Sequence, residues 1–184
     1  MHRSILVALA MASLSVFVSG QAKSNTVISG QIREAGADRT FSITYDRNSN
    51  VSKLMAVSEN FSDRDADKMG VQAMNFAVGF MYPSESLVKA PDSLIFTFWV
   101  LTRRPRFAAN HHLSVGSLDL GPARYVSKPR ANMEYLNFDI SRDHLEKIVT
   151  ERNAKVTLGD FEIQFTREQM KILAALLNLS DPSK

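Results

Sequence analysis

Cysteine is absent from all 184 residues of this chain, and that absence excludes disulfides, cysteine–zinc centres and thiol catalysis. Small secreted proteins commonly use disulfides to reinforce a weak core. A mature chain of roughly 160 residues can bury about 70% of its extended surface, so an apolar core alone can hold it together. We therefore expect a protein whose stability comes from packing.

Familiar catalytic motifs are also absent. The sequence has no Gly-x-Ser-x-Gly elbow, no His-Glu-x-x-His and no glycine loop of the kind that cradles phosphate. "SLVK", Ser86 to Lys89, matches a Ser-x-x-Lys nucleophile pattern, but its companion motifs Ser-Asp-Asn and Lys-Thr-Gly are missing. The sequence thus assigns no catalytic residue and no cofactor.

Metal-binding patterns are incomplete. Asp63, Asp65 and Asp67 open like a calcium loop, but Lys68 and Met74 stand where an EF-hand needs glycine and glutamate. An acidic first helical turn capped by Ser62 explains the run equally well. Two adjacent histidines, at positions 111 and 112, point apart on a strand and fall short of a zinc ligand set. We expect no metal site.

Long apolar runs are confined to the N-terminus. Met1 to Arg3 is positive, Ile5 to Val18 is apolar and uncharged, and small residues follow at 18–22. The run is shorter than the roughly 20 residues of a membrane-spanning helix, so we favour a cleaved secretory signal over residues 1–20 against a retained anchor. A secreted or periplasmic location follows, and the lack of cysteine favours a bacterial protein.

Acidic charge is scarce in one part of the chain. The net charge is only +3, too small to indicate a nucleic-acid partner, but residues 103–130 contain six basic residues and one acid. If the loops of this stretch lie at one end of a sheet, they form a cationic surface for an acidic protein, an acidic polymer or a lipid headgroup. The alternative is solvated loop charge that only promotes solubility. The candidate binding residues are Arg103, Arg104, Arg106, Phe107, Arg124, Lys128 and Arg130.

Short alternating segments dominate the middle of the chain. Two extended runs around Asn-Ser-Asn at 48–50 predict a hairpin, and Leu94 to Arg103 predicts a buried strand. "LSVGSLDLG" and "ARYVSK" predict two more strands around Gly121-Pro122, and 133–140 another. Residues 69–82 fit either a strand or a helix, and we favour a strand over the second half.

One phrase occurs twice. "FDISRDHLEKIV" begins at Phe138, and "IQFTREQMKILA" begins 25 residues later. In each copy a strand runs into a helix whose N-cap is Ser141 or Thr166. Gln169 completes a capping box in the second copy. Because capping accounts for the shared polar residues, we interpret the repeat as architecture, with Arg142 and Arg167 on the exposed side of the first turn.

These elements predict an α+β fold, a mostly antiparallel sheet of several short strands with two C-terminal helices packed on it. Residues 1–20 are the signal, 21–39 form an entry segment without clear periodicity, and 40–180 form a single α+β domain. Between the two copies, "KVTLGDFEIQF" predicts a hairpin with a two-residue Gly-Asp turn.

The C-terminal half resembles known proteins. "SLIFTFWV", "HLSVGSLDLGPARY", "YLNFDISRDHLEKIV" and "LGDFEIQFTREQMKILAALL" are similar in layout to small exported bacterial proteins with no assigned activity. The resemblance covers about residues 93–179. It implies the fold and an exported location, and it brings no catalytic residues.

The sequence therefore favours an exported, non-catalytic binding module that engages a partner through the basic stretch. The first alternative is a carrier of a small apolar ligand, whose cavity would be lined by methionines and by Phe76, Phe80, Phe96, Phe98 and Trp99. The second is an unrecognised hydrolase, which would need a convergent arrangement such as Asp–His–Ser in a cleft.

Overall fold

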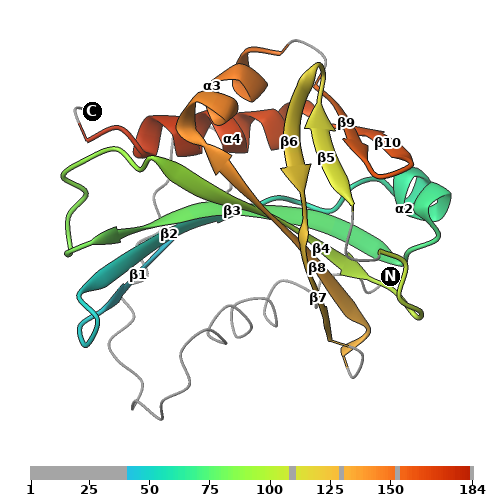
Figure 1. Cartoon of the computed structure of the whole chain (residues 1–184), viewed down its shortest axis with the longest axis horizontal. Coiled ribbons are helices and arrows are strands. Elements are labelled where there is room, and N and C mark those ends of the chain that lie inside the picture. Colours follow the sequence, from blue (N-terminus) through green and yellow to red (C-terminus); the bar gives the residue numbers. More distant parts are fainter. Residues whose placement is uncertain (1–40, 108–110, 129–130, 152–153, 183–184) are drawn as a thin grey trace.

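Two antiparallel sheets and three helices make up the described part of the chain (Figure 1). The computed structural model describes residues 41–107, 111–128, 131–151 and 154–182. The helices are α2 (Asp63–Met69), α3 (Arg142–Thr150) and α4 (Arg167–Leu179). The strands are β1 (Phe41–Asp46), β2 (Val51–Val57), β3 (Ala73–Pro83), β4 (Ser93–Leu101), β5 (His112–Val115), β6 (Leu118–Pro122), β7 (Arg124–Lys128), β8 (Met133–Ser141), β9 (Lys155–Leu158) and β10 (Phe161–Gln164).

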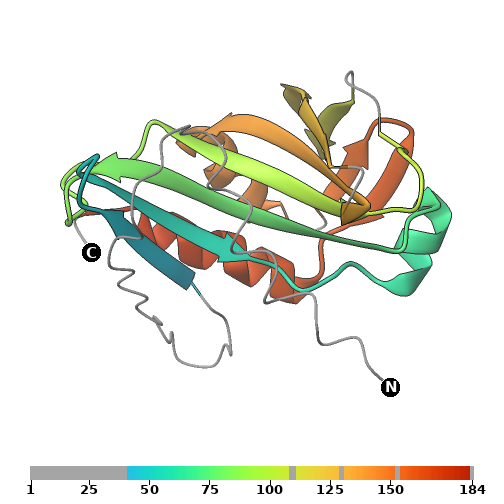
Figure 2. The ribbon, with the colours of Figure 1, turned by 90° about the horizontal axis from the view of Figure 1, so that it is seen from below.

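The larger sheet has the strand order β1-β2-β3-β4-β8-β7. Its first four strands follow one another along the chain, and every neighbouring pair is antiparallel. In Figure 1 the sheet arches, and α3, α4 and the smaller sheet all lie over one side of it, here called the inner face. Figure 2 shows α4 behind these strands when the molecule is seen from below. The opposite side is called the outer face.

The smaller sheet has the order β10-β9-β5-β6. The two strands predicted around Gly121-Pro122 are in fact three, because Gly116, at φ 59°, turns the chain between β5 and β6. β6 and β7 do not pair with each other as a hairpin. Instead the chain leaves the smaller sheet at Pro122 and enters the larger sheet at Arg124, so that one extended segment serves both sheets.

Aromatic side chains fill the core between the inner face and the helices. Phe76 and Phe96 stack with ring centroids 4.9 Å apart, and Phe96 lies 5.2 Å from Phe98. Phe165, just before α4, meets the Phe76 ring edge-on at 5.2 Å. These phenylalanines are each at most 5% exposed. Aromatic pairs in such geometries add stability beyond the area that they bury.

Both helices of the repeated phrase begin as predicted. The Ser141 hydroxyl accepts from the His144 N–H at 3.1 Å, and the Thr166 hydroxyl accepts from the Gln169 N–H at 3.1 Å. The Gln169 side chain accepts in return from the Thr166 N–H at 3.0 Å, which completes the capping box. The prediction that Arg142 is exposed is wrong, because its side chain is 21% exposed and bonds to α4.

Two helices were predicted, and the described residues contain a third, α2. Ser62 caps it by accepting from the Asp65 N–H, so the capping interpretation of the acidic run is confirmed. Gly70, at φ 69°, then ends α2 in the left-handed conformation that glycine adopts without strain. The ambiguous stretch that follows forms β3, as favoured. The predicted hairpins at 41–57 and 155–164 are also confirmed.

Some predictions fall outside the described residues. The signal over 1–20 and the entry segment over 21–39 both precede Phe41, and Arg130 lies in one of the gaps. Among the helices in the described ranges, none is both long and apolar enough to cross a bilayer. The coarse fold, α+β with mostly antiparallel strands, is as predicted.

Candidate functional site

The two basic segments of the sequence meet at one end of the larger sheet. Residues 102–107 leave the end of β4, and the Thr102 N–H donates to the carbonyl of Asn132 at 2.8 Å. Asn132 precedes β8, and Lys128 ends β7 in register with Met133. This arrangement places the Arg103 segment and Lys128 side by side, and we name the surface formed by the exposed Arg103 and Arg104 and the half-buried Lys128 the basic end.

A buried carboxylate fixes the Arg103 segment. Glu134 of β8 is 1% exposed, and its two oxygens accept from the backbone N–H groups of Arg106 at 2.9 Å and Phe107 at 3.1 Å. The Tyr125 hydroxyl donates a third hydrogen bond to the same carboxylate. Because a buried carboxylate is costly without such donors, Glu134 and the segment hold each other in place.

The environment of Tyr125 follows from this arrangement. Burial raises the pKa of the Tyr125 phenol above its ordinary value, and the hydrogen bond to Glu134 raises it further. The neutral phenol is therefore the form that the folded protein favours, because only that form donates to the carboxylate. Tyr125 is thus a structural partner of Glu134 rather than a contact for ligand.

Arg106 is occupied within the protein. Its Nε donates to the carbonyl of Met69 at 3.0 Å, and its guanidinium lies 5.2 Å from the centroid of the Phe161 ring. These contacts tie the Arg103 segment to the end of α2 and to β10. Arg106 belongs to the scaffold beneath the basic end, although its side chain is accessible at the surface.

Phe107 does not contribute to a surface. It is 1% exposed, and its ring packs edge-on against His111 at 5.1 Å and Phe161 at 5.9 Å. The prediction of a solvent-facing aromatic at this position is corrected by that burial. The physical reason is that Glu134 captures the Phe107 N–H and draws this end of the segment inward.

Arg124 lies at the other end of β7. It bonds Asp139 of β8 at 2.8 Å, and both side chains are about 60% exposed. Four residue steps along β7, about 13 Å, separate it from Lys128. Because Asp139 balances its charge locally, Arg124 adds little to the field of the basic end.

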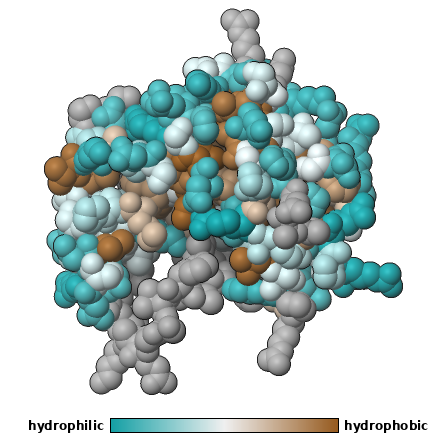
Figure 3. All heavy atoms as spheres, in the orientation of Figure 1, coloured by the Kyte–Doolittle hydropathy of each residue, from teal (hydrophilic) through white to brown (hydrophobic). Residues whose placement is uncertain are grey.

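Among the described residues, Arg103 and Arg104 are the exposed cations of the basic end. Neither guanidinium forms an ion pair within the described residues. Lys128 is half-buried, and its ammonium lies 5.1 Å from the centroid of the Tyr135 ring. Figure 3 shows hydrophilic side chains over much of the molecule on the side that it presents, with separate hydrophobic areas between them.

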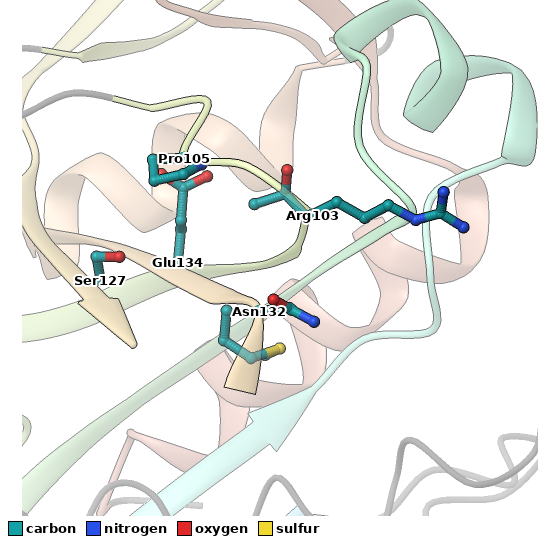
Figure 4. Close-up of a pocket in the computed structure, with 7 residues that line it drawn as sticks. Arg103, Pro105, Ser127, Asn132 and Glu134 are labelled. Carbon is teal, nitrogen blue, oxygen red and sulfur yellow. The ribbon is translucent and has the colours of Figure 1, made fainter. Parts of the chain in front are cut away.

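A small cavity lies behind the Arg103 segment. Its volume is about 60 Å³, room for a water or two rather than for a substrate. Figure 4 shows Glu134 beside Pro105, while the guanidinium of Arg103 extends away from this pair. The cavity is lined by Thr102, Arg103, Pro105, Ser127, Asn132, Met133 and Glu134.

The remaining candidates have local structural partners. Lys89 pairs with Asp92 at 3.0 Å, so the structure does not bring its ammonium to Ser86 as a nucleophile would need. His112 faces Asp119 at 3.7 Å, whereas His111 packs on Phe107. In the described residues, no group of three or more His, Asp or Glu side chains is placed to hold a metal ion.

Glu134 is the residue that the sequence interpretation missed. In "MEYLNFDI" it shares its side of the strand with Leu136, Phe138 and Ile140, which the alternation assigns to the core. An acid on the buried side of a strand predicts a set of donors around it. That signal was present in the sequence, but the two backbone donors come from residues 28 and 27 positions earlier and could not be paired with it.

No family model, no curated protein and no solved structure matches this chain. The resemblance to small exported bacterial proteins of unassigned activity therefore stays a prediction.

Proposed function

We propose that this chain is an exported, non-catalytic binding protein that engages an anionic partner through the basic end. The observation that carries the proposal is the pair of exposed guanidiniums on Arg103 and Arg104, which have no acidic partner among the described residues. Guanidiniums bind carboxylates and phosphates through paired hydrogen bonds. Such groups occur on acidic proteins, acidic polymers and lipid headgroups alike.

Rigid support favours binding over mere solubility. The Arg103 segment is held at both ends, by the Thr102–Asn132 hydrogen bond and by the two N–H groups that bond to Glu134. A segment that is already ordered loses less conformational entropy when it binds. A stretch whose charge served only solubility would gain nothing from a buried carboxylate beneath it.

The carrier alternative receives less support. Phe76, Phe96 and Phe98 pack against one another at 4.9 to 6.4 Å and fill the core rather than line a ligand cavity. Trp99 lies on the other face of the sheet, since alternate residues of β4 point to opposite sides. The hydrolase alternative needs Asp, His and Ser side chains that converge in a cleft. Lys89 pairs with Asp92 and His112 faces Asp119, so the described residues do not favour it.

The test compares two variants that change the net charge equally. Arg103→Ala with Arg104→Ala lowers the net charge by two at the basic end. Arg47→Glu also lowers the net charge by two, but in the β1–β2 loop at the opposite end of the sheet. Binding is measured to polyglutamate and to vesicles of anionic lipid at low and physiological salt. Each surface cation contributes about 1 kcal/mol near an anionic membrane, so the double variant should bind roughly 10- to 100-fold more weakly.

The control variant decides the interpretation. If Arg47→Glu weakens binding as much as the double variant does, the net charge of the protein is responsible and the basic end is not a site. If neither probe binds the unchanged protein even at low salt, the proposal of an anionic partner fails. Preference for one probe would show which kind of anion is bound.

A further inference from the structure

β1 forms an edge of the larger sheet. It is the first strand of the order β1-β2-β3-β4-β8-β7, and among the described strands it pairs with β2 alone (Figure 1). Every second residue of an edge strand turns its backbone N–H and C=O away from the neighbouring strand. These groups form a template on which a further strand can pair.

The other edges of the two sheets carry features that discourage such pairing. β7 has a cation at each end, Arg124 and Lys128. β6 contains Asp119 and ends at Pro122, which has no N–H to donate. β10 is four residues long and lies against α2. Charge, proline, short length and a covering helix are the usual protections of a sheet edge.

β1 differs from these edges in composition. Its first five residues, 41–45, contain no charge, no proline and no glycine, and all but Ser42 are aromatic or β-branched. Thr44 is exposed, and Ser42, Ile43 and Tyr45 are half-buried. A strand of this composition favours pairing with a further strand.

The sequence of β1 is also symmetric in residue class. "FSITY" reads aromatic, hydroxyl, aliphatic, hydroxyl, aromatic about Ile43. When a two-fold axis relates two antiparallel copies of a strand, residues equally far from the centre lie opposite each other. A centre at Ile43 places Phe41 opposite Tyr45, Ser42 opposite Thr44 and Ile43 opposite itself. Aromatic pairs and Ser/Thr pairs are among the cross-strand pairs that stabilise a sheet.

The same symmetry keeps the two faces of the sheet in place. Phe41, Ile43 and Tyr45 point to the inner face, and Ser42 and Thr44 point to the outer face. In the two-fold arrangement each of these residues lies opposite a residue of its own face. The inner faces of the two copies therefore continue into each other, with their helices on the same side.

We propose that two copies of this chain pair through β1 about a two-fold axis at Ile43, which joins two six-stranded sheets into one continuous sheet. The partner is a second copy because the residue classes of β1 match when the strand meets itself. A single pair of strands makes a small interface, so the dimer should dissociate at micromolar concentrations. This inference stands independently of the anionic partner proposed for the basic end.

The lack of cysteine makes the register directly testable. The protein, purified as cells produce it, carries either Ser42→Cys or Thr44→Cys and is oxidised mildly, alone or as an equimolar mixture at the same total concentration. Directly opposite residues lie about 4.5–5.5 Å apart, within the range of a disulfide, whereas diagonal neighbours such as 42 and 42 lie about 7–8 Å apart. We expect severalfold more cross-linked dimer in the mixture than with either variant alone. Val126→Cys, exposed on the β7 edge, is the control and should stay monomeric.

Charge variants test the same pairing without cysteine. Ser42→Glu with Thr44→Glu places like charges opposite each other across the two-fold axis, and Ser42→Lys with Thr44→Glu places opposite charges there. In both variants the acid at position 44 lies opposite Lys53 of its own chain, so the variants differ only at position 42. Sedimentation equilibrium should give a dissociation constant about tenfold higher for the doubly acidic variant than for the unchanged protein. The variant with opposite charges should dimerise at least as well as the unchanged protein.

Three results would overturn the proposal. The first is an unchanged protein that stays monomeric up to millimolar concentration. The second is a dimer that forms equally well in the two charge variants, and the third is cross-linking through Val126→Cys as readily as in the mixture, since either would place the interface elsewhere. If the doubly acidic variant does not fold, the cysteine measurement decides.

Discussion

Arg142, in the first turn of α3, donates a hydrogen bond to the hydroxyl of Ser180, the C-cap residue of α4. Its Nη1 also lies 3.5 Å from the carbonyl of Leu177, and its Nε lies 3.3 Å from Glu146. The guanidinium thus sits where the carbonyl end of α4 carries partial negative charge, which a cation stabilises. Arg142, which belongs to the first copy of the repeated phrase, thus connects α3 to the end of α4.

The two copies of the phrase provide a matched pair of variants. Arg142→Ala should lower the free energy of unfolding by about 1–3 kcal/mol, because it removes a charged hydrogen bond and leaves α4 carbonyls without a donor. Arg167→Ala, the equivalent change at an exposed position, should alter it by less than about 0.5 kcal/mol. Urea unfolding measures both. Equal effects would mean that the arginine acts within its own helix and not across the pair.

This pair also shows where sequence interpretation ends. Ser141 and Thr166 act on residues three positions away, so the caps could be predicted from the sequence. The fate of Arg142 depends on Ser180, 38 positions later, and on how α3 and α4 pack. The residues around Arg142 and Arg167 follow the same pattern, so the sequence predicted an exposed position for both.

The strands show the same difference between what local pattern and what long-range pairing determine. Local patterns predicted the strands β4 and β8, and a strand over the second half of residues 69–82, because a strand pattern depends only on neighbouring residues. The transfer of the chain from the smaller to the larger sheet at Ala123 could not be predicted, since it depends on which partner each half finds. The sequence predicted the positive charge of the basic end. It did not predict that the Arg103 segment is held by Glu134, because Glu134 binds a segment far away in the sequence.

Loss of the buried carboxylate should loosen the basic end. Glu134→Gln keeps the size of the side chain but places an amide N–H₂ where one of the two oxygens accepted, against the N–H donor of residue 106 or 107, and we expect a loss of about 1–3 kcal/mol in stability. Limited proteolysis should then cut within residues 102–107. Glu162→Gln, an exposed partner of Lys155, is the control and should cost at most about 1 kcal/mol. Cleavage at an unchanged rate would contradict the role assigned to Glu134.

Tyr125 should make stability fall at high pH. Because its folded pKa is raised above the unfolded value of 10.0, its contribution is complete below about pH 10 and is lost as the pH rises through the folded pKa. Tyr125→Phe should flatten that decline. Urea unfolding from about pH 9 to about pH 11, together with the ultraviolet absorption of tyrosinate, measures the effect. An identical decline in the variant would assign it to other groups.

Lys53 should make stability depend on pH in the opposite direction. Its folded pKa is lowered below 10.5 by burial, so its contribution is complete above about pH 10.5 and is lost as the pH falls through the folded pKa. Lys53→Met should therefore be more stable than the unchanged protein at neutral pH, and the difference should shrink above about pH 10.5. Lys171→Met, at an exposed position of α4, is the control. A destabilised Lys53→Met variant would contradict this prediction.

The strand order also has a consequence for the folding reaction. β1 to β4 form a meander whose pairings are local, whereas β8 joins β4 only after about 30 intervening residues have been gathered into the loop between them. Closing that loop brings Glu134 to the Arg103 segment and brings β7 to its place at the edge of the sheet. We expect the transition state to contain the meander with this loop still open. Changes at the meander should slow refolding, and changes at Glu134 should mainly speed unfolding.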